Sequence, residues 1–217
     1  MLFRSSTFGA ERAGNADGSI PAWDGGYTKV DPSFKEGGKR SDPFAADKPL
    51  FSITSKNLAQ YAGKLSAGTL EMFKRFPDTY RIDVYQTRRT AAAPQWVYDN
   101  TMQNATRATL EEATEKVSGA YGGIPFPIPQ NGAEVLWNYR LSWQGGDTLN
   151  APFDTWLMTA GGKKLQATRA RFWYQHPYYF KEGNLETYGG KHLIGKLATE
   201  QPSSKAGEGL MTHWDMD

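Results

Sequence analysis

The alternation of apolar and polar residues is clearest in residues 153–175, where it predicts a β-hairpin. Two alternating stretches, 153–160 and 163–175, flank the dipeptide Gly161-Gly162. Glycine adopts positive φ without steric cost, so a Gly-Gly pair is typical of the two-residue turns that join antiparallel strands. The pattern therefore predicts two strands with a tight turn between them.

Such a turn fixes which residues face each other, and it sorts the side chains into two faces. One face carries the pairs Met158–Leu165 and Trp156–Ala167, then Trp173, and it ends in the charge pair Asp154–Arg169. The other face pairs Thr155 with Thr168 and Leu157 with Gln166. The first face is apolar and the second mostly polar. An apolar face of this kind forms either an ordinary core or the wall of a ligand cavity.

Apolar residues at helical spacing predict two short amphipathic helices before the hairpin, at roughly 55–64 and 67–76. Thr54 or Ser55 would cap the first helix and Ser66 the second, because a hydroxyl oxygen accepts a bond from a free N–H of the first turn. Alternation in residues 79–87 then predicts a strand.

The middle of the chain has a mixed pattern. Residues 95–117 fit either one helix or a strand followed by a helix, and the run 110–113 favours a helix at the end. The alternate prolines of 122–129 predict extended chain, because proline lacks a donor and biases the preceding residue away from helix. A helix opened by Asn131 or Gly132 should follow. Two further strands are expected at 191–199 and 207–215.

Residues 1–50 have little periodicity and many glycines and prolines, which predicts an irregular N-terminal arm, either an ordered wrap or a flexible segment. The remaining residues, 51–217, would form one domain. Its predicted elements give an α+β fold in which short α-helices cover an antiparallel β-sheet.

Composition and charge narrow the classes of function. The net charge is +2 and the basic residues form no stripe, which argues against nucleic-acid binding. The absence of cysteine excludes a disulfide scaffold, a thiolate metal site and a cysteine nucleophile. No run approaches the ~20 apolar residues that span a bilayer. Aromatic residues make up 13% of the chain, which favours either a β-rich core or a surface where apolar groups meet water.

No pattern of catalytic residues occurs, so the sequence predicts no enzyme, no cofactor and no metal site. The spacing of a zinc site and the nucleophile turn of a hydrolase are both missing around the three histidines, His176, His192 and His213. Asn15, Asp17 and Ser19 resemble the opening of a calcium loop. The glutamate expected at its far end is missing, which favours a plain turn.

Four blocks of sequence together indicate a family resemblance: residues 9–23, residues 53–62, residues 85–89 and the proline block 123–129 with 135–138. In this order they resemble a bacterial exported family known as domain-of-unknown-function family 1329. That family is distantly similar to the lipoprotein carriers LolA and LolB. The resemblance runs from about residue 9 to the end of the chain.

The resemblance implies a strongly curved antiparallel sheet closed by helices, an incomplete LolA/LolB-like half-barrel with a hydrophobic cavity for acyl chains. It also implies a periplasmic protein made with a signal peptide and without established catalytic residues. The chain departs from the family at both ends. Residues 1–8 carry no signal peptide, and members usually continue beyond Asp217 through a β-rich second half, so a fragment, a split-gene product or a shortened variant is expected.

Three functions follow as hypotheses. The first is non-enzymatic binding or carriage of a lipid-like, hydrophobic molecule in the cell envelope. Its ligand-binding residues would be Trp156, Met158, Leu165, Ala167 and Trp173, with Asp154 and Arg169 at the cavity mouth. The alternative is a protein-interaction module that docks on an outer-membrane or export partner. The third is a sugar-binding protein or hydrolase that stacks coplanar rings on a sugar.

Overall fold

The computed structural model describes residues 8–35, 37–38, 40–111, 113, 116–190, 193–200 and 209–216. Their contacts divide the chain into two compact units. The small unit is Arg12–Ala92, and the large unit combines Met1–Glu11 with Ala93–Asp217. The sequence placed a division at residue 50, whereas residues 12–50 here share a unit with residues 51–92.

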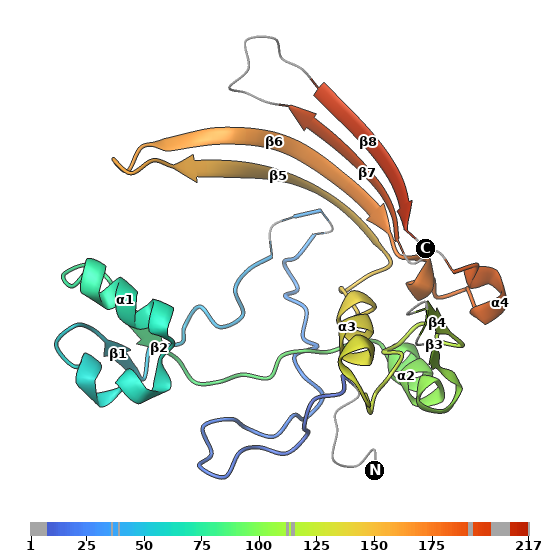
Figure 1. Ribbon diagram of the computed structural model, residues 1–217, viewed down its shortest axis with the longest axis horizontal. Coiled ribbons are helices and arrows are strands. Elements are labelled where there is room, and N and C mark those ends of the chain that lie inside the picture. The colour runs from blue at the N-terminus through green and yellow to red at the C-terminus, as the bar shows by residue number, and fades with distance from the viewer. Residues whose placement is uncertain are drawn as a thin grey trace. The chain divides into compact units, whose positions relative to one another are not determined.

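The small unit contains a two-stranded sheet and one α-helix (Figure 1). Strand β1 (Phe51–Ile53) pairs antiparallel with β2 (Ile82–Val84), which lies inside the predicted strand 79–87. Helix α1 (Ala67–Arg75) begins after Ser66, whose hydroxyl accepts the N–H of Thr69 at 3.2 Å. The predicted second helix and its cap are therefore confirmed.

The first predicted helix, 55–64, is wrong. The chain there forms two short 3₁₀ turns, η1 (Leu58–Gln60) and η2 (Ala62–Lys64). The side chain of Asn57 accepts the N–H of Thr54 at 2.7 Å, so the predicted cap residue is itself held in a turn by a later side chain. Short 3₁₀ pieces of this kind are common connectors.

Residues 12–50 contain no helix or strand in the part that the structure describes, as predicted for the arm. They are nevertheless anchored within the small unit. The indole of the buried Trp23 donates to the carbonyl of Ala91 at 2.9 Å. The guanidinium of Arg88 donates twice to Asp47, at 2.6 and 2.8 Å, and lies 4.2 Å over the ring of Phe44. The described arm is an ordered wrap.

The candidate calcium loop in the arm is a self-contained turn. Asp17 accepts the N–H of Ser19 at 2.9 Å, and the Asn15 amide donates to the Ser19 hydroxyl at 2.7 Å. The polar side chains that would have met a cation bond to one another.

In the large unit, residues 95–118 form a helix followed by a hairpin. Helix α2 spans Gln95–Arg107, and strands β3 (Thr109–Glu111) and β4 (Lys116–Ser118) pair antiparallel after it. The helix favoured by the run 110–113 is wrong. Cross-strand pairing of Leu110 with Val117 overrides the local helix preference there.

The proline block is extended, as predicted, and it leads into a confirmed helix. Helix α3 spans Gly132–Arg140, and the side chain of Asn131 accepts the N–H of Glu134 at 2.9 Å. A side chain of α2 holds the extended backbone that precedes α3. The amide of the buried Asn104 lies within hydrogen-bonding distance of the carbonyls of Tyr121, Gly123 and Ile124, at 3.1–3.2 Å.

A small aromatic core surrounds this arrangement. Its buried members come from α2, from the segment before the proline block, from the end of α3 and from the 3₁₀ turn η3 (Pro177–Tyr179): Val97, Ala120, Leu141, Tyr178 and Tyr179. Gly123 has to be a glycine here, because an added Cβ would lie 2.5 Å from the backbone nitrogen of Thr101.

The longest strands form a four-stranded antiparallel sheet that bends along its length (Figure 1). The order is β5 (Thr148–Met158), β6 (Lys164–Gln175), β7 (Leu193–Glu200) and β8 (Gly209–Met216). Turn η3 and helix α4 (Leu185–Tyr188) connect β6 to β7. The strands predicted at 191–199 and 207–215 are confirmed. Pro152 lies in β5, an edge strand of the described sheet, where its missing N–H is tolerated.

The predicted hairpin exists, but its turn is longer than two residues. The strands end at Met158 and begin again at Lys164, and Gly162 alone of the two glycines adopts positive φ, at 78°. The N–H of Gly162 donates to the carbonyl of Thr159 at 2.9 Å, and the N–H of Thr159 donates to the carbonyl of Lys163 at 3.0 Å. A five-residue connection, 159–163, therefore replaces the two-residue Gly-Gly turn.

The fold is a mixture of α-helices with several short antiparallel sheets, and the described strands close no barrel. This agrees with the coarse α+β prediction. The finer prediction, a half-barrel like that of the lipoprotein carriers, stays a prediction.

Candidate functional site

The longer turn changes the register of the hairpin, and with it the predicted ligand-binding face. Trp156 pairs with Gln166, and Leu157 pairs with Leu165. The register shifts by one residue between Thr155 and Trp156, which leaves Ala167 as a bulge. Beyond the bulge, the predicted pairs Thr155–Thr168 and Asp154–Arg169 are correct.

The apolar side chains of the hairpin tip are consequently divided between two faces. Trp156 and Met158 share a face with Gln166 and Lys164, while Leu165 lies on the other face with Leu157. The ammonium of Lys164 lies 4.6 Å over the Trp156 ring. The prediction that Trp156, Met158 and Leu165 form one apolar face is wrong, because one bulged residue in β6 reverses the facing of the β6 residues between it and the turn.

The predicted site residues differ in how much they are exposed. Trp156 is 47% and Met158 67% exposed, and Leu165 is exposed as well. Ala167 and Trp173 are half-buried. Arg169 donates to Asp154 at 3.2 Å, so the predicted charge pair forms, on the surface. Neither of the two clefts described next is lined by any of these residues.

The larger cleft of the large unit has a volume of about 780 Å³ and lies against α3; we call it the α3 cleft. Helix α3, strand β4, turn η3 and the end of α4 all contribute to its lining. Its apolar and aromatic lining includes Ala120, Leu136, Trp137, Leu141, Tyr178 and Tyr188. Volumes of about 300–1,000 Å³ with a largely apolar lining are typical of small-molecule sites.

The α3 cleft is graded from an apolar floor to a charged rim. Ala120, Leu141 and Tyr178 are buried, whereas Lys116 and Arg140 are exposed. Arg140 lies 4.6 Å over the Trp137 ring, a cation–π contact that holds the guanidinium beside the cleft. The described lining includes two cations and no carboxylate.

The hydroxyl of Tyr178 forms a hydrogen bond within the protein. It donates to the carbonyl of Gly123 at 2.6 Å. Burial raises the pKa of Tyr178 well above its ordinary value of 10.0, and the neighbouring Tyr179 and Tyr188 raise it further by smaller amounts. At the floor of the α3 cleft this side chain is a neutral ring that is suited to contact rather than to proton transfer.

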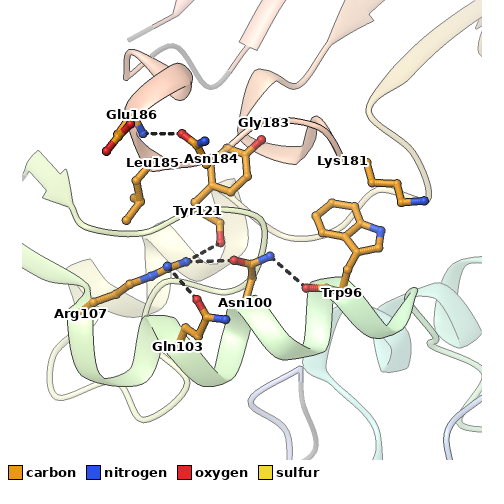
Figure 2. A pocket seen from close by; sticks show the side chains of 10 residues that line it. All are labelled: Trp96, Asn100, Gln103, Arg107, Tyr121, Lys181, Gly183, Asn184, Leu185 and Glu186. Atoms are coloured by element: carbon orange, nitrogen blue, oxygen red, sulfur yellow. Dashed lines mark hydrogen bonds between the residues drawn. The ribbon is translucent and has the colours of Figure 1, made fainter.

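A second pocket, the Arg107 pocket, has a volume of about 450 Å³ (Figure 2). Side chains of α2 line one side and residues 181–186 the other. The guanidinium of Arg107 donates to four neutral oxygens at 3.0–3.4 Å, those of Asn100, Gln103, Asn104 and the Tyr121 carbonyl. Arg107 therefore ties α2 to the segment that follows β4.

The rim of the Arg107 pocket is polar and mixed in charge. Lys181 and Glu186 line it, and neither side chain has a hydrogen bond or ion pair to the described residues. Trp96 meets Trp143 edge-on, at 87° between the ring planes. These two rings do not provide the coplanar platform that the sugar-binding hypothesis requires.

The α3 cleft was not found by reasoning from the sequence. Of Val135, Leu136 and Tyr139 in α3, only Leu136 lines the cleft. The other lining residues come from segments that are far apart in the chain. The one local signal was the density of aromatic residues around Trp137 and in Tyr178-Tyr179.

The described residues contain no group of three or more His, Asp or Glu side chains that could hold a metal ion. Within the same residues, no helix combines the length and apolar character needed to cross a membrane.

Comparison with known proteins gives two matches. The sequence model of a family described as "Protein of unknown function (DUF1329)" matches residues 52–217, which include both clefts. An uncharacterized protein of Pseudomonas aeruginosa is 39% identical over 210 residues, which cover 94% of this chain and 45% of that protein. The chain thus spans less than half the length of this curated relative. No solved structure matches.

Proposed function

The chain belongs to the DUF1329 family, and we propose that it binds a lipid-like molecule in the α3 cleft without transforming it chemically. The observation that carries the proposal is the lining of the cleft, an apolar and aromatic floor of adequate volume below an exposed rim. Each ~100 Å² of apolar ligand surface that this floor removes from water would contribute about 2.5 kcal/mol before the costs of binding.

The proposal moves the ligand site away from the hairpin. The hairpin tip offers its large apolar side chains on two faces and exposes them, whereas the α3 cleft gathers buried apolar groups on one concave surface. A concave apolar surface excludes more water from a small ligand than an exposed strand face does. The cell envelope remains the proposed place of action, on the strength of the family resemblance.

The first test uses N-phenyl-1-naphthylamine, an uncharged fluorescent probe of apolar sites. Leu136 lines the cleft and is 57% exposed, so Leu136→Asp should fold and still place a charge beside the bound probe. We expect it to weaken probe binding about tenfold, which corresponds to about 1.4 kcal/mol. Val135→Asp is the matched control, since Val135 is the preceding residue of α3, is 54% exposed and does not line the cleft.

Equal binding by the two variants would place the probe elsewhere. No binding by the wild-type chain would contradict the proposed function. Circular dichroism and thermal unfolding should show that both variants fold, and this separates a lost site from a lost structure.

The second candidate is a protein-interaction module, and one specific observation favours it. Large apolar side chains are exposed at the tip of the β5–β6 hairpin, among them Phe153, Trp156, Leu157 and Met158. Exposed apolar clusters often mark interaction surfaces. A chain that fails to bind N-phenyl-1-naphthylamine would favour this candidate.

A further inference from the structure

The described residues at the rim of the α3 cleft carry charge of one sign. Lys116, from β4, and Arg140, from the last turn of α3, both line the cleft, and no aspartate or glutamate occurs in its described lining. A purely apolar ligand would gain nothing from two cations. Cations at the open end of an apolar cavity are the arrangement that fits an amphipathic molecule with a negatively charged end.

We propose that the ligand of the α3 cleft is an anionic amphiphile, whose apolar chain contacts the floor and whose carboxylate or phosphate oxygens meet Arg140 and Lys116. This rests on the proposed function and adds the chemical class of the ligand. It differs from a general affinity for apolar molecules because it requires discrimination between a charged and an uncharged head group on the same chain.

Three nearby carboxylates do not belong to the described lining of the cleft. Glu111 lies opposite Lys116 in the β3–β4 pair. Glu134 belongs to the first turn of α3, where its two oxygens accept from the Gln130 N–H at 2.6 Å and the Asn131 amide at 3.5 Å. Glu186 lines the Arg107 pocket. None of these three carboxylates is part of the described lining of the α3 cleft.

Arg140 is the better placed of the two cations. Its guanidinium is held over the Trp137 ring, and Trp137 itself lines the cleft. The planar fork of arginine can bind two oxygens of one carboxylate or phosphate at once, whereas the ammonium of Lys116 acts as a point charge. We therefore expect Arg140 to contribute more to head-group preference than Lys116.

The experiment compares three competitors that share one decyl chain: undecanoate, decyl phosphate and 1-decanol. Each displaces N-phenyl-1-naphthylamine from the full chain, and the readout is the ratio of the anion's affinity to that of the alcohol. We expect the wild-type chain to prefer the anions by about fivefold, which corresponds to about 1 kcal/mol. The preference should decline as salt is added, because the charged rim is exposed. The two anion arms show whether the site prefers carboxylate or phosphate.

Three variants assign the preference to residues. Arg140→Gln should bring the ratio close to one while decanol binds as before, and Lys116→Gln should have a smaller effect in the same direction. Arg140→Lys, which keeps the charge, should keep part of the preference. Lys181→Gln is the matched control, since it removes one positive charge from the rim of the other pocket and should leave the ratio unchanged.

Each contrary result has a distinct meaning. Equal competition by decanol and both anions, or a preference that survives Arg140→Gln and Lys116→Gln, would overturn this inference and leave the proposed function standing. The same holds if Lys181→Gln lowers the ratio as much as Arg140→Gln does. Loss of N-phenyl-1-naphthylamine binding in the wild-type chain would overturn both proposals.

Discussion

Two regions of the large unit use apolar residues in opposite ways. Around α2 and η3, side chains such as Val97, Tyr178 and Tyr179 are buried and the segments that carry them are far apart in sequence. At the tip of the β5–β6 hairpin, Trp156 and Met158 are exposed although the strand alternation there is the clearest in the chain. The clearest apolar–polar periodicity thus lies in an exposed hairpin held by backbone hydrogen bonds. The concave apolar surface of the α3 cleft forms from segments whose periodicity is weak.

The two regions are also held together differently. The hairpin depends on regular pairing between adjacent strands. The α2 region depends on side chains that bond to irregular backbone, since Asn104 reaches three carbonyls with its amide and accepts the N–H of Tyr121 at 3.2 Å with its oxygen. In the α2 region, the Asn104 side chain therefore forms the backbone hydrogen bonds that a neighbouring strand would form in a sheet. We therefore expect substitutions in the two regions to have very different costs.

The largest effect should come from Asn104→Ala. Asn104 is 1% exposed, and loss of its side chain removes the partner of the buried Tyr121 N–H and of the buried Ile124 carbonyl. We expect the free energy of unfolding to fall by about 3 kcal/mol in urea titration. Gln103→Ala removes an exposed side chain of the same helix that also bonds to Arg107, and should change it by less than about 0.5 kcal/mol. Similar costs would show that Asn104 is not the support we describe.

A smaller effect is expected from Tyr178→Phe, and it should depend on pH. At neutral pH the variant loses the bond to the Gly123 carbonyl, which should cost about 1 kcal/mol. Burial raises the pKa of Tyr178 in the folded chain, so its stabilising contribution is present below the unfolded value of about 10 and declines as pH rises above it. The difference between wild type and Tyr178→Phe in urea titrations should therefore shrink above about pH 10. A difference that does not change between neutral and alkaline pH would contradict this role.

Local signals were sufficient for the elements that local chemistry determines. Ser66 and Asn131 cap their helices as predicted, and the proline block is extended. The resemblance to domain-of-unknown-function family 1329 was also correct. The hairpin was located but its register near the turn was not, because the position of a bulge such as Ala167 depends on turn geometry that two glycines alone do not specify.

The candidate site was out of reach for a different reason. Asn104 is a polar residue at a buried position of α2, so the pattern of apolar residues does not indicate that it is buried. The α3 cleft is assembled from β4, α3, η3 and α4, so its residues come together only in the folded chain. Arg140 and Lys116 are ordinary surface cations in the sequence. Their shared cleft is a property of tertiary structure.

The smallest effect on stability should come from Trp156→Glu, which tests the comparison from the side of the hairpin. Trp156 is 47% exposed and contacts the ammonium of Lys164, which a glutamate would still face. We expect the free energy of unfolding to change by less than about 1 kcal/mol, and the binding of N-phenyl-1-naphthylamine to change by less than about twofold. Thr155→Glu, which adds the same charge on the other face of β5, is the matched control. If Trp156→Glu abolishes probe binding in a folded chain and Thr155→Glu does not, the ligand site is on the hairpin, as the alternation first predicted, and the α3 cleft is not the site.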